Sequence, residues 1–143
     1  RSSRFFLVVF VVAGWLTANP AQAQQWKVTY NANWINAVFM LTPTTGWAVG
    51  DFGKIRYTTD GGLSWTFQDA NTSATLNSVW GTDENNVWIV GNRGVILKWN
   101  GSSWQSQNSG TTNQLLDVWG LDANNIWAVG SGGVGTILKW NGS

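Results

Sequence analysis

The sequence contains no cysteine and no histidine among its 143 residues. Without cysteine, no disulfide bond can support the fold. Without histidine, the side chain best suited to acid–base catalysis near neutral pH and the commonest metal ligand are both missing. We therefore expect a non-catalytic protein, with no catalytic residue, no bound metal and no cofactor.

Charged residues are also scarce, at 10% of the chain, and the formal net charge is +1. Two of the eight basic residues, Arg1 and Arg4, lie at the N-terminal end, which leaves six basic against seven acidic residues in the remainder. No basic excess remains there to hold a phosphate backbone, so we expect no nucleic-acid partner. Low charge together with many Gly, Asn, Ser and Thr residues favours a β-rich chain with numerous turns.

An apolar run over residues 5–16 follows the two arginines, and the small-residue pattern Ala21-Gln22-Ala23 comes soon after it. This order predicts a secretory signal peptide over residues 1–23, cut after Ala23. The alternative is a membrane span, but twelve helical residues reach only about 18 Å, well short of a hydrocarbon core of about 30 Å. We expect a protein that is secreted, periplasmic or at the cell surface, with no membrane contact beyond this segment.

The rest of the chain repeats itself. Residues 76–104 read LNSVWGTDENNVWIVGNRGVILKWNGSSW, residues 115–143 read LLDVWGLDANNIWAVGSGGVGTILKWNGS, and residues 35–65 form a fainter copy. A period of about 40 residues with several short apolar runs per unit predicts an all-β fold made of β-propeller blades, each with four antiparallel strands. We place the first blade at 34–74, the second at 75–113 and an incomplete third at 114–143.

The middle unit shows how one blade is built. We expect strands over 76–80, 87–90, 95–99 and 103–107, with Asn100-Gly101 forming a type I′ hairpin turn between the last two. The run Val87-Trp88-Ile89-Val90 is apolar on both faces. Such a strand fits a sheet that is covered on both sides, as a blade between two neighbouring blades would be.

The two ends of the array complement each other. Residues 26–33 begin with Trp26, which precedes Ile35 by nine residues much as Trp104 precedes Leu115 by eleven. We interpret 26–33 as an orphan outer strand, whereas the third unit stops before its own fourth strand. Three blades are fewer than the four to eight of known propellers. We therefore expect either that this is part of a longer protein or that chains associate, with Trp26 of one completing the last blade of another.

Tryptophan is unusually frequent, with twelve residues in all. A buried tryptophan removes about 150–250 Å² from water, which contributes roughly 4–6 kcal/mol before entropy is subtracted. Units this small can therefore build a core by stacking on one another. The tryptophans that we assign to the repeat core are Trp47, Trp80, Trp88, Trp104, Trp119 and Trp127.

One turn carries a recognisable motif. Residues 58–65, TTDGGLSW, match [Ser/Thr]-x-Asp-x-Gly-x-[Ser/Thr]-Trp at every fixed position. We expect the aspartate to accept backbone N–H bonds, the glycine to adopt a positive φ and the tryptophan to pack between blades. The residues of this structural motif are Thr58, Asp60, Gly62, Ser64 and Trp65.

The motif resembles the Asp-box of bacterial-neuraminidase-type repeats. The surrounding GWAVGDFGKIRYTTDGGLSW is similar to the propellers of the photosystem II stability/assembly-factor-like family, and the resemblance covers residues 26–143. The two later units lack the Asp-box aspartate because their turn is two residues shorter. The resemblance implies a propeller fold and an assembly-factor-like role.

From this we expect an exported, non-catalytic propeller that binds a protein or helps to assemble one. A first alternative is a lectin-like propeller whose tryptophans stack on sugars. A second is a fragment of an Asp-box glycoside hydrolase, but a sialidase-like site needs an arginine cluster. Arg56 and Arg93 lie at non-equivalent positions of their units, and Asp83, Glu84 and Asp122 lie in predicted solvated turns.

Overall fold

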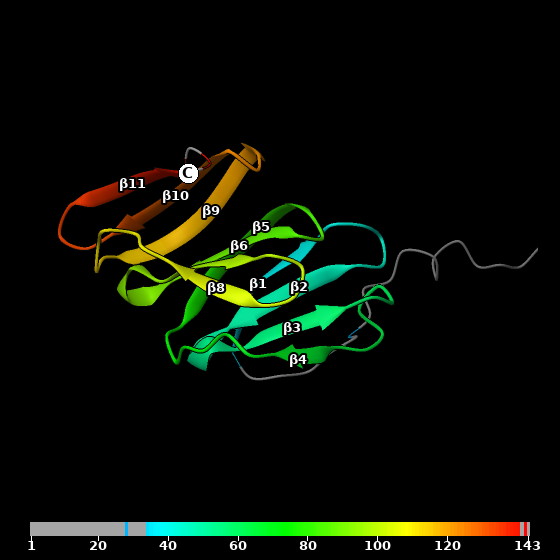
Figure 1. Cartoon of the computed structure of the whole chain (residues 1–143). Coiled ribbons are helices and arrows are strands. Elements are labelled where there is room, and N and C mark those ends of the chain that lie inside the picture. The colour runs from blue at the N-terminus through cyan, green and yellow to red at the C-terminus, as the bar shows by residue number, and fades with distance from the viewer. Residues whose placement is uncertain (1–27, 29–33, 141, 143) are drawn as a thin grey trace, which may run out of the picture.

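Three antiparallel sheets follow one another along the chain and stack face to face, with the third at the top and the first at the bottom of Figure 1. The structure is a computed structural model that describes residues 28, 34–140 and 142. The predicted signal peptide (1–23) lies outside the described residues, as does the predicted orphan strand (26–33) apart from Val28. Nothing in the structure therefore tests those two predictions.

Each sheet is a simple meander in which consecutive strands are neighbours. The first sheet contains β1 (Ile35–Met40), β2 (Gly46–Gly50), β3 (Ile55–Thr58) and β4 (Thr66–Gln68). The second contains β5 (Leu76–Asp83), β6 (Asn86–Gly91), β7 (Ile96–Trp99) and β8 (Trp104–Gln107). The third contains β9 (Gln114–Asp122), β10 (Asn125–Ser131) and β11 (Gly135–Trp140). The prediction of an all-β chain built from four-stranded antiparallel blades is confirmed.

The second strand of each sheet shows how the sheets are covered. All of β2 is buried, and so is β6 from Val87 onward. The strand β6 contributes to a hydrophobic cluster on each side of the second sheet, whereas β2 contributes Trp47 and Val49 to the cluster on one side. Along β10, by contrast, more buried residues alternate with more exposed ones. The reason is that no described residue covers the far face of the third sheet. Contacts between sheets are most extensive among the first strands β1, β5 and β9, so the sheets fan out from that edge.

The turn between β7 and β8 differs from the prediction. A type I′ turn needs positive φ at both central residues, but only Gly101 has it, at φ +95°. Residues 100–103 form a four-residue loop in which the Asn100 side-chain oxygen accepts the backbone N–H groups of Ser102 (3.0 Å) and Ser103 (2.9 Å). This side-chain bonding closes the loop without a left-handed asparagine, so the type I′ prediction was wrong.

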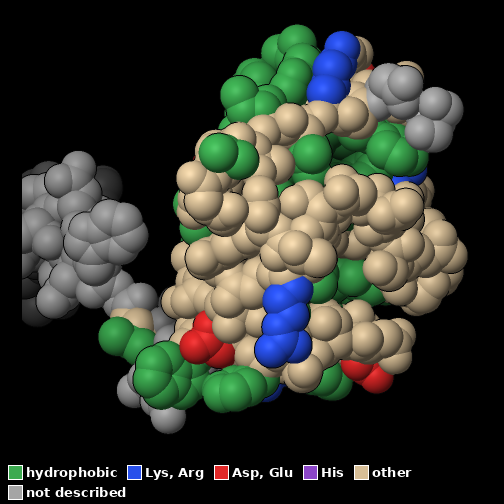
Figure 2. Space-filling model, turned by 90° about the vertical axis from the view of Figure 1, so that its left-hand side faces the viewer, with side chains coloured by type: hydrophobic (Ala, Val, Ile, Leu, Met, Phe, Trp, Pro, Cys, Tyr) green, Lys and Arg blue, Asp and Glu red, His purple; other side chains and the backbone are tan. Residues whose placement is uncertain are grey.

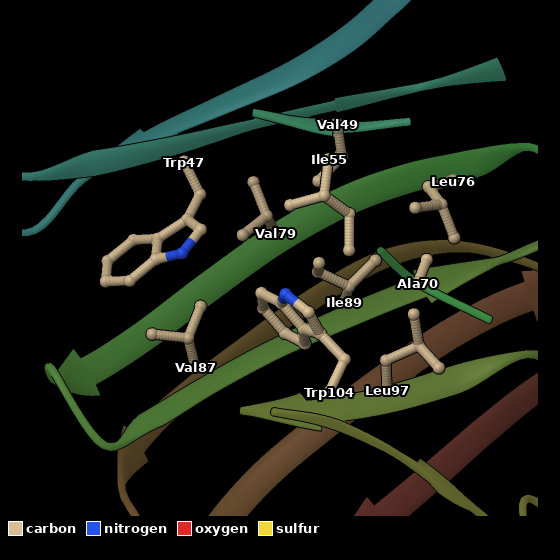
Figure 3. Packing of buried hydrophobic residues seen from close by; sticks show 10 residues of the cluster. All are labelled: Trp47, Val49, Ile55, Ala70, Leu76, Val79, Val87, Ile89, Leu97 and Trp104. Carbon is tan, nitrogen blue, oxygen red and sulfur yellow. The ribbon is translucent and has the colours of Figure 1, made fainter. Parts of the chain in front are cut away.

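Two hydrophobic clusters form the core, one on each side of the second sheet. The cluster between the first and second sheets, shown in Figure 3, includes Trp47, Ile55 and Leu97, with the indole of Trp104 reaching into it from β8. The cluster between the second and third sheets includes Trp88, Leu115 and Ile126. Stacking of sheets therefore buries the apolar residues that a single sheet could not cover.

The repeat tryptophans are not equally buried. Trp47, Trp88 and Trp104 are buried, and Trp80 and Trp127 are half-buried. The prediction fails for Trp119, which is 56% exposed. Trp80 packs toward the third sheet, where a Cβ added to Gly120 would lie 2.6 Å from the Trp80 ring. In β9, Trp119 lies between the buried residues Val118 and Gly120, so its side chain is on the opposite face of the third sheet. No described residue covers that face.

Candidate functional site

The 58–65 turn between β3 and β4 is closed by side chains. One oxygen of Asp60 accepts the backbone N–H of Ser64 (2.9 Å) and the hydroxyl of Thr58 (2.8 Å), and the other accepts the hydroxyl of Ser64 (2.6 Å). The Thr58 oxygen accepts the N–H of Gly62 (2.9 Å), whose φ is +86°, and the indole N–H of Trp65 donates to the Gly62 carbonyl (3.1 Å). Four side chains and the Gly62 backbone hold one another in a single conformation.

The same bonds set the ionisation of Asp60. The hydroxyl of Ser64 contributes most, followed by the Ser64 backbone N–H and the hydroxyl of Thr58, and together they lower the Asp60 pKa from 3.8 to about 2. The carboxylate is therefore ionised at any physiological pH, with both oxygens already engaged inside the turn. A carboxylate so engaged stabilises its turn and has little capacity left for a ligand.

Two further aspartates follow the same principle at the ends of the long first strands. Asp83 accepts the N–H of Asn85 (2.9 Å), and Asp122 accepts that of Asn124 (2.8 Å). The backbone bond from Asn124 is the main cause of a lowered Asp122 pKa. Burial of Asp83 acts to raise its pKa, but bonds led by the Asn85 N–H outweigh this and lower it. Glu84 is exposed next to Asp83. These acidic residues lie in solvated turns.

Two asparagines connect each sheet to the next, and we call them the asparagine clamps. The side-chain NH₂ of Asn36 on β1 donates to Asp51 (3.1 Å) in its own sheet and to the carbonyl of Leu76 (3.0 Å) in the second sheet. The NH₂ of Asn77 on β5 donates to Asn92 (3.0 Å) and to the carbonyl of Leu115 (2.6 Å) in the third. An NH₂ group carries two hydrogens and can make both bonds at once.

Each clamp fixes the turn between the second and third strands of its sheet. These turns are η1 (Asp51–Gly53) and η2 (Asn92–Gly94). Their middle residues, Phe52 (φ +58°) and Arg93 (φ +59°), adopt the left-handed conformation, which costs a residue with a side chain about 1–2 kcal/mol. Phe52 is 68% exposed and Arg93 is also exposed.

We call the side of the molecule that carries these turns the turn face. It also includes the β10–β11 turn and the connections from β4 to β5 and from β8 to β9, and it lies on the left in Figure 1. Figure 2 views this side directly: charged side chains are few and scattered, and hydrophobic side chains gather at its upper and lower ends. The 58–65 turn lies at the opposite ends of the strands.

Sequence reasoning did not find the asparagine clamps or Phe52. A signal was present, because the three repeat units begin INAVF, LNSVW and LLDVW, with asparagine in second place in two of the three. Arg56 and Arg93 are not brought together: Arg56 lies within β3 with its guanidinium 5.1 Å from the Phe67 ring, whereas Arg93 projects from η2. Within residues 34–140 no three acidic residues are gathered in a way that could hold a metal ion.

The part of the chain that the structure describes has no helix long and apolar enough to cross a membrane. Its stacked four-stranded meanders define the class: an all-β protein built from β-propeller blades. The chain is 33% identical over 92 residues to the photosystem II assembly lipoprotein Ycf48 of Picosynechococcus sp., an alignment that covers 59% of this chain. The chain spans 27% of that relative's length.

Two solved structures share the fold over 76% of this chain. One, described as YCF48 bound to D1 peptide, gives a TM-score of 0.64 at 23% identity, and the match covers 36% of it. The other, YCF48 from Cyanidioschyzon merolae, gives a TM-score of 0.62 at 22% identity, with 37% covered. At such identities the likeness concerns the fold. No protein-family model matches the chain.

Proposed function

We propose that this chain is part of an exported, non-catalytic β-propeller that binds a polypeptide segment on the turn face and acts as an assembly-factor-like scaffold. The observation that carries the proposal is the pair of exposed, left-handed residues Phe52 and Arg93 at matching positions of consecutive sheets. Backbone strain that recurs at an exposed position favours a role in binding over one in packing. Relatedness to an assembly lipoprotein and to a peptide-bound structure supports the same class of function.

The clamped turns suit this role physically. Because Asn36 and Asn77 tie their turns to the next sheet, the side chains of Phe52 and Arg93 are presented from a rigid backbone, and less conformational entropy is lost on binding. Phe52 offers an apolar ring and Arg93 a planar fork of donors that matches a carboxylate. The partner that fits is an extended segment with an apolar side chain and an acidic group.

Titration calorimetry with the D1 peptide of the solved complex tests the proposal. Phe52→Gly and Arg93→Gly remove the side chains and suit a positive φ, so both variants should fold while their affinity falls about tenfold or more. Leu63→Ala, in the 58–65 turn at the opposite ends of the strands, is the matched control and should bind as the unmodified chain does. Absence of binding by the unmodified chain, or equal losses in all three variants, would refute the proposal.

A carbohydrate-binding function is supported by one observation, the 56% exposure of Trp119 on the third sheet. A flat, exposed indole is suited to stacking on a sugar ring. A glycan array probed with the unmodified chain and with Trp119→Ala separates the two functions, since only a lectin gives hits that this substitution removes. The glycoside-hydrolase alternative gains no support from Asp60, Asp83 or Asp122, whose oxygens bond within their own turns.

A further inference from the structure

A hollow of about 310 Å³ lies between the outer strands of the first and second sheets, and we call it the rim hollow. One wall is the end of β4 with the connection that follows it, and the other is the hairpin of β7 and β8. The lining consists of two tryptophans, one carboxylate, two side-chain amides and two serines. The size is at the lower end of the range for ligand sites, about 300–1,000 Å³, and suits a single side chain.

Two tryptophans form the apolar part of the rim hollow. Trp99 on β7 lies directly opposite Trp104 on β8, and their ring centroids are 5.2 Å apart. Trp104 is the buried indole of the first cluster in Figure 3, whereas Trp99 is only half-buried and stays partly accessible. An indole face attracts a cation, as on the other side of this sheet, where Lys98 Nζ lies 5.1 Å from the Trp88 ring centroid. Within residues 34–140, no lysine or arginine lies over Trp99 in this way.

The charged residue that lines the rim hollow is Asp69, which follows β4 and is exposed. Its Oδ1 accepts the backbone N–H of Asn71 (2.9 Å) and so closes the turn. At the same place after β8, the Oδ1 of Asn108 accepts the N–H of Gly110 (3.0 Å). A neutral amide therefore closes this turn as well as a carboxylate does. The turn does not require the negative charge of Asp69.

Asn71 is a second difference between these two turns. It has φ +51°, and its counterpart Gly110 has φ +68°. Glycine adopts this left-handed conformation without steric cost, whereas a residue with a side chain is strained there. The turn after β4 therefore carries a side chain where its backbone favours glycine, and that side chain lines the rim hollow. The charge of Asp69 and the amide of Asn71 are explained by what they present to the hollow and not by the turn.

We propose that the rim hollow binds an arginine side chain of a polypeptide partner. The planar guanidinium lies over the Trp99 ring and donates two parallel N–H bonds to the Asp69 carboxylate. Asp69 keeps its bond to the Asn71 backbone, because each carboxylate oxygen can accept two hydrogens. The side-chain oxygen of Asn71 and the hydroxyls of Ser102 and Ser103 are acceptors for the remaining N–H groups. Arginine is favoured over lysine because a guanidinium both stacks on an indole and matches a carboxylate with a rigid fork.

An NMR titration of the ¹⁵N-labelled full chain tests the proposal, with N-acetyl-arginine amide as the probe. The arginine probe should shift the indole N–H signal of Trp99 and the backbone signals of Asp69 and Asn71. A single stacked ion pair binds weakly, so the dissociation constant should be on the order of 1 mM. The control probe is N-acetyl-citrulline amide, which has the same shape but a neutral urea in place of the guanidinium. It should bind about tenfold more weakly, and N-acetyl-lysine amide should fall between the two.

Asp69→Asn separates binding from folding. Because Asn108 closes the equivalent turn with an amide, this variant should melt at the same temperature as the unmodified chain, while its affinity for the arginine probe falls about fivefold to tenfold. The matched control is Asp122→Asn, which removes the same charge from a turn closed in the same way, by the N–H of Asn124 (2.8 Å), and should leave the affinity unchanged. Phe52→Gly should also leave it unchanged, because Phe52 does not line the rim hollow. Binding in the rim hollow and peptide binding on the turn face therefore succeed or fail independently.

Several outcomes would reject the proposal. If the citrulline probe binds as tightly as the arginine probe, or if the Trp99 signal does not shift at about 20 mM arginine probe, the hollow does not select a guanidinium. If Asp122→Asn weakens binding as much as Asp69→Asn, the chain attracts cations without a defined site. A lower melting temperature for Asp69→Asn would show that the turn itself requires the carboxylate. If methyl glucoside shifts the Trp99 signal and the arginine probe does not, the hollow accepts a sugar ring instead.

Discussion

Replacing Trp104 by alanine should destabilise the protein by about 3–5 kcal/mol. The side chain is 6% exposed, lies in the cluster between the first and second sheets, and donates to Gln68. Truncation of a large buried aromatic residue typically costs this much, because the apolar contacts disappear and a cavity remains. The lost N–H···O bond accounts for about 1 kcal/mol of it.

The matched control is Trp119→Ala on the third sheet. Its side chain is 56% exposed, with its ring centroid 6.5 Å from that of Trp80. Little apolar area returns to water when this side chain is removed, so the expected cost is below about 1 kcal/mol. The two substitutions delete the same atoms and differ only in how the fold covers them.

Urea melts followed by circular dichroism measure both effects. With a slope of about 2 kcal/mol per M for a domain of this size, Trp104→Ala should lower the midpoint by roughly 2 M, and Trp119→Ala by under about 0.5 M. A small loss at Trp104 would refute the packing of β8 into the first cluster. Equal, large losses at both positions would mean that the far face of the third sheet is covered in solution.

Three further outcomes are expected. Asp60→Asn should lower the melting temperature at pH 7. Because the Asp60 pKa is about 2 instead of 3.8, the carboxylate stabilises the fold above about pH 4. The difference in melting temperature between the unmodified chain and Asp60→Asn should therefore vanish as the pH falls to about 2. Trp88→Phe should change the free energy of unfolding by less than about 1 kcal/mol in urea melts, since it removes a buried indole N–H that has no acceptor and so offsets the lost ring area. Arg93→Gly should leave stability unchanged or raise it by up to about 1 kcal/mol by calorimetry, because glycine tolerates the positive φ; a clear loss would show that the arginine side chain holds η2 in place.

The sheets could be predicted because their signals are local. Alternation and turn residues mark each strand, and the doubly apolar run from Val87 to Val90 indicates a strand covered on both sides, as observed. The 58–65 turn is equally local, since the side-chain hydrogen bonds of Thr58 and Asp60 that close it join residues within four positions of one another. Such features depend on short-range chemistry that the sequence displays directly.

What could not be predicted depends on contacts between distant parts of the chain. The clamp bond from Asn36 to the Leu76 carbonyl joins residues 40 positions apart. No local sequence pattern identifies which carbonyl accepts this bond. The left-handed residues Phe52 and Arg93 were hidden because the glycines that mark their turns come one position later. Trp119 matches Trp80 in the repeat but not in exposure, because burial depends on what lies beside the sheet.

The asparagine clamps also restrict how such an array can be rearranged. Each one reaches forward, from the first strand of one sheet to a backbone carbonyl of the next, so the unit that comes earlier in the chain supplies the connection and the later one only receives it. The third unit has Leu116 in that position and can receive a neighbour but cannot offer the same bond. A duplicated or transplanted unit would therefore keep its spacing from the preceding sheet only if the unit before it carried the asparagine. The order of the repeats, and not merely their number, therefore determines whether neighbouring sheets are connected in this way.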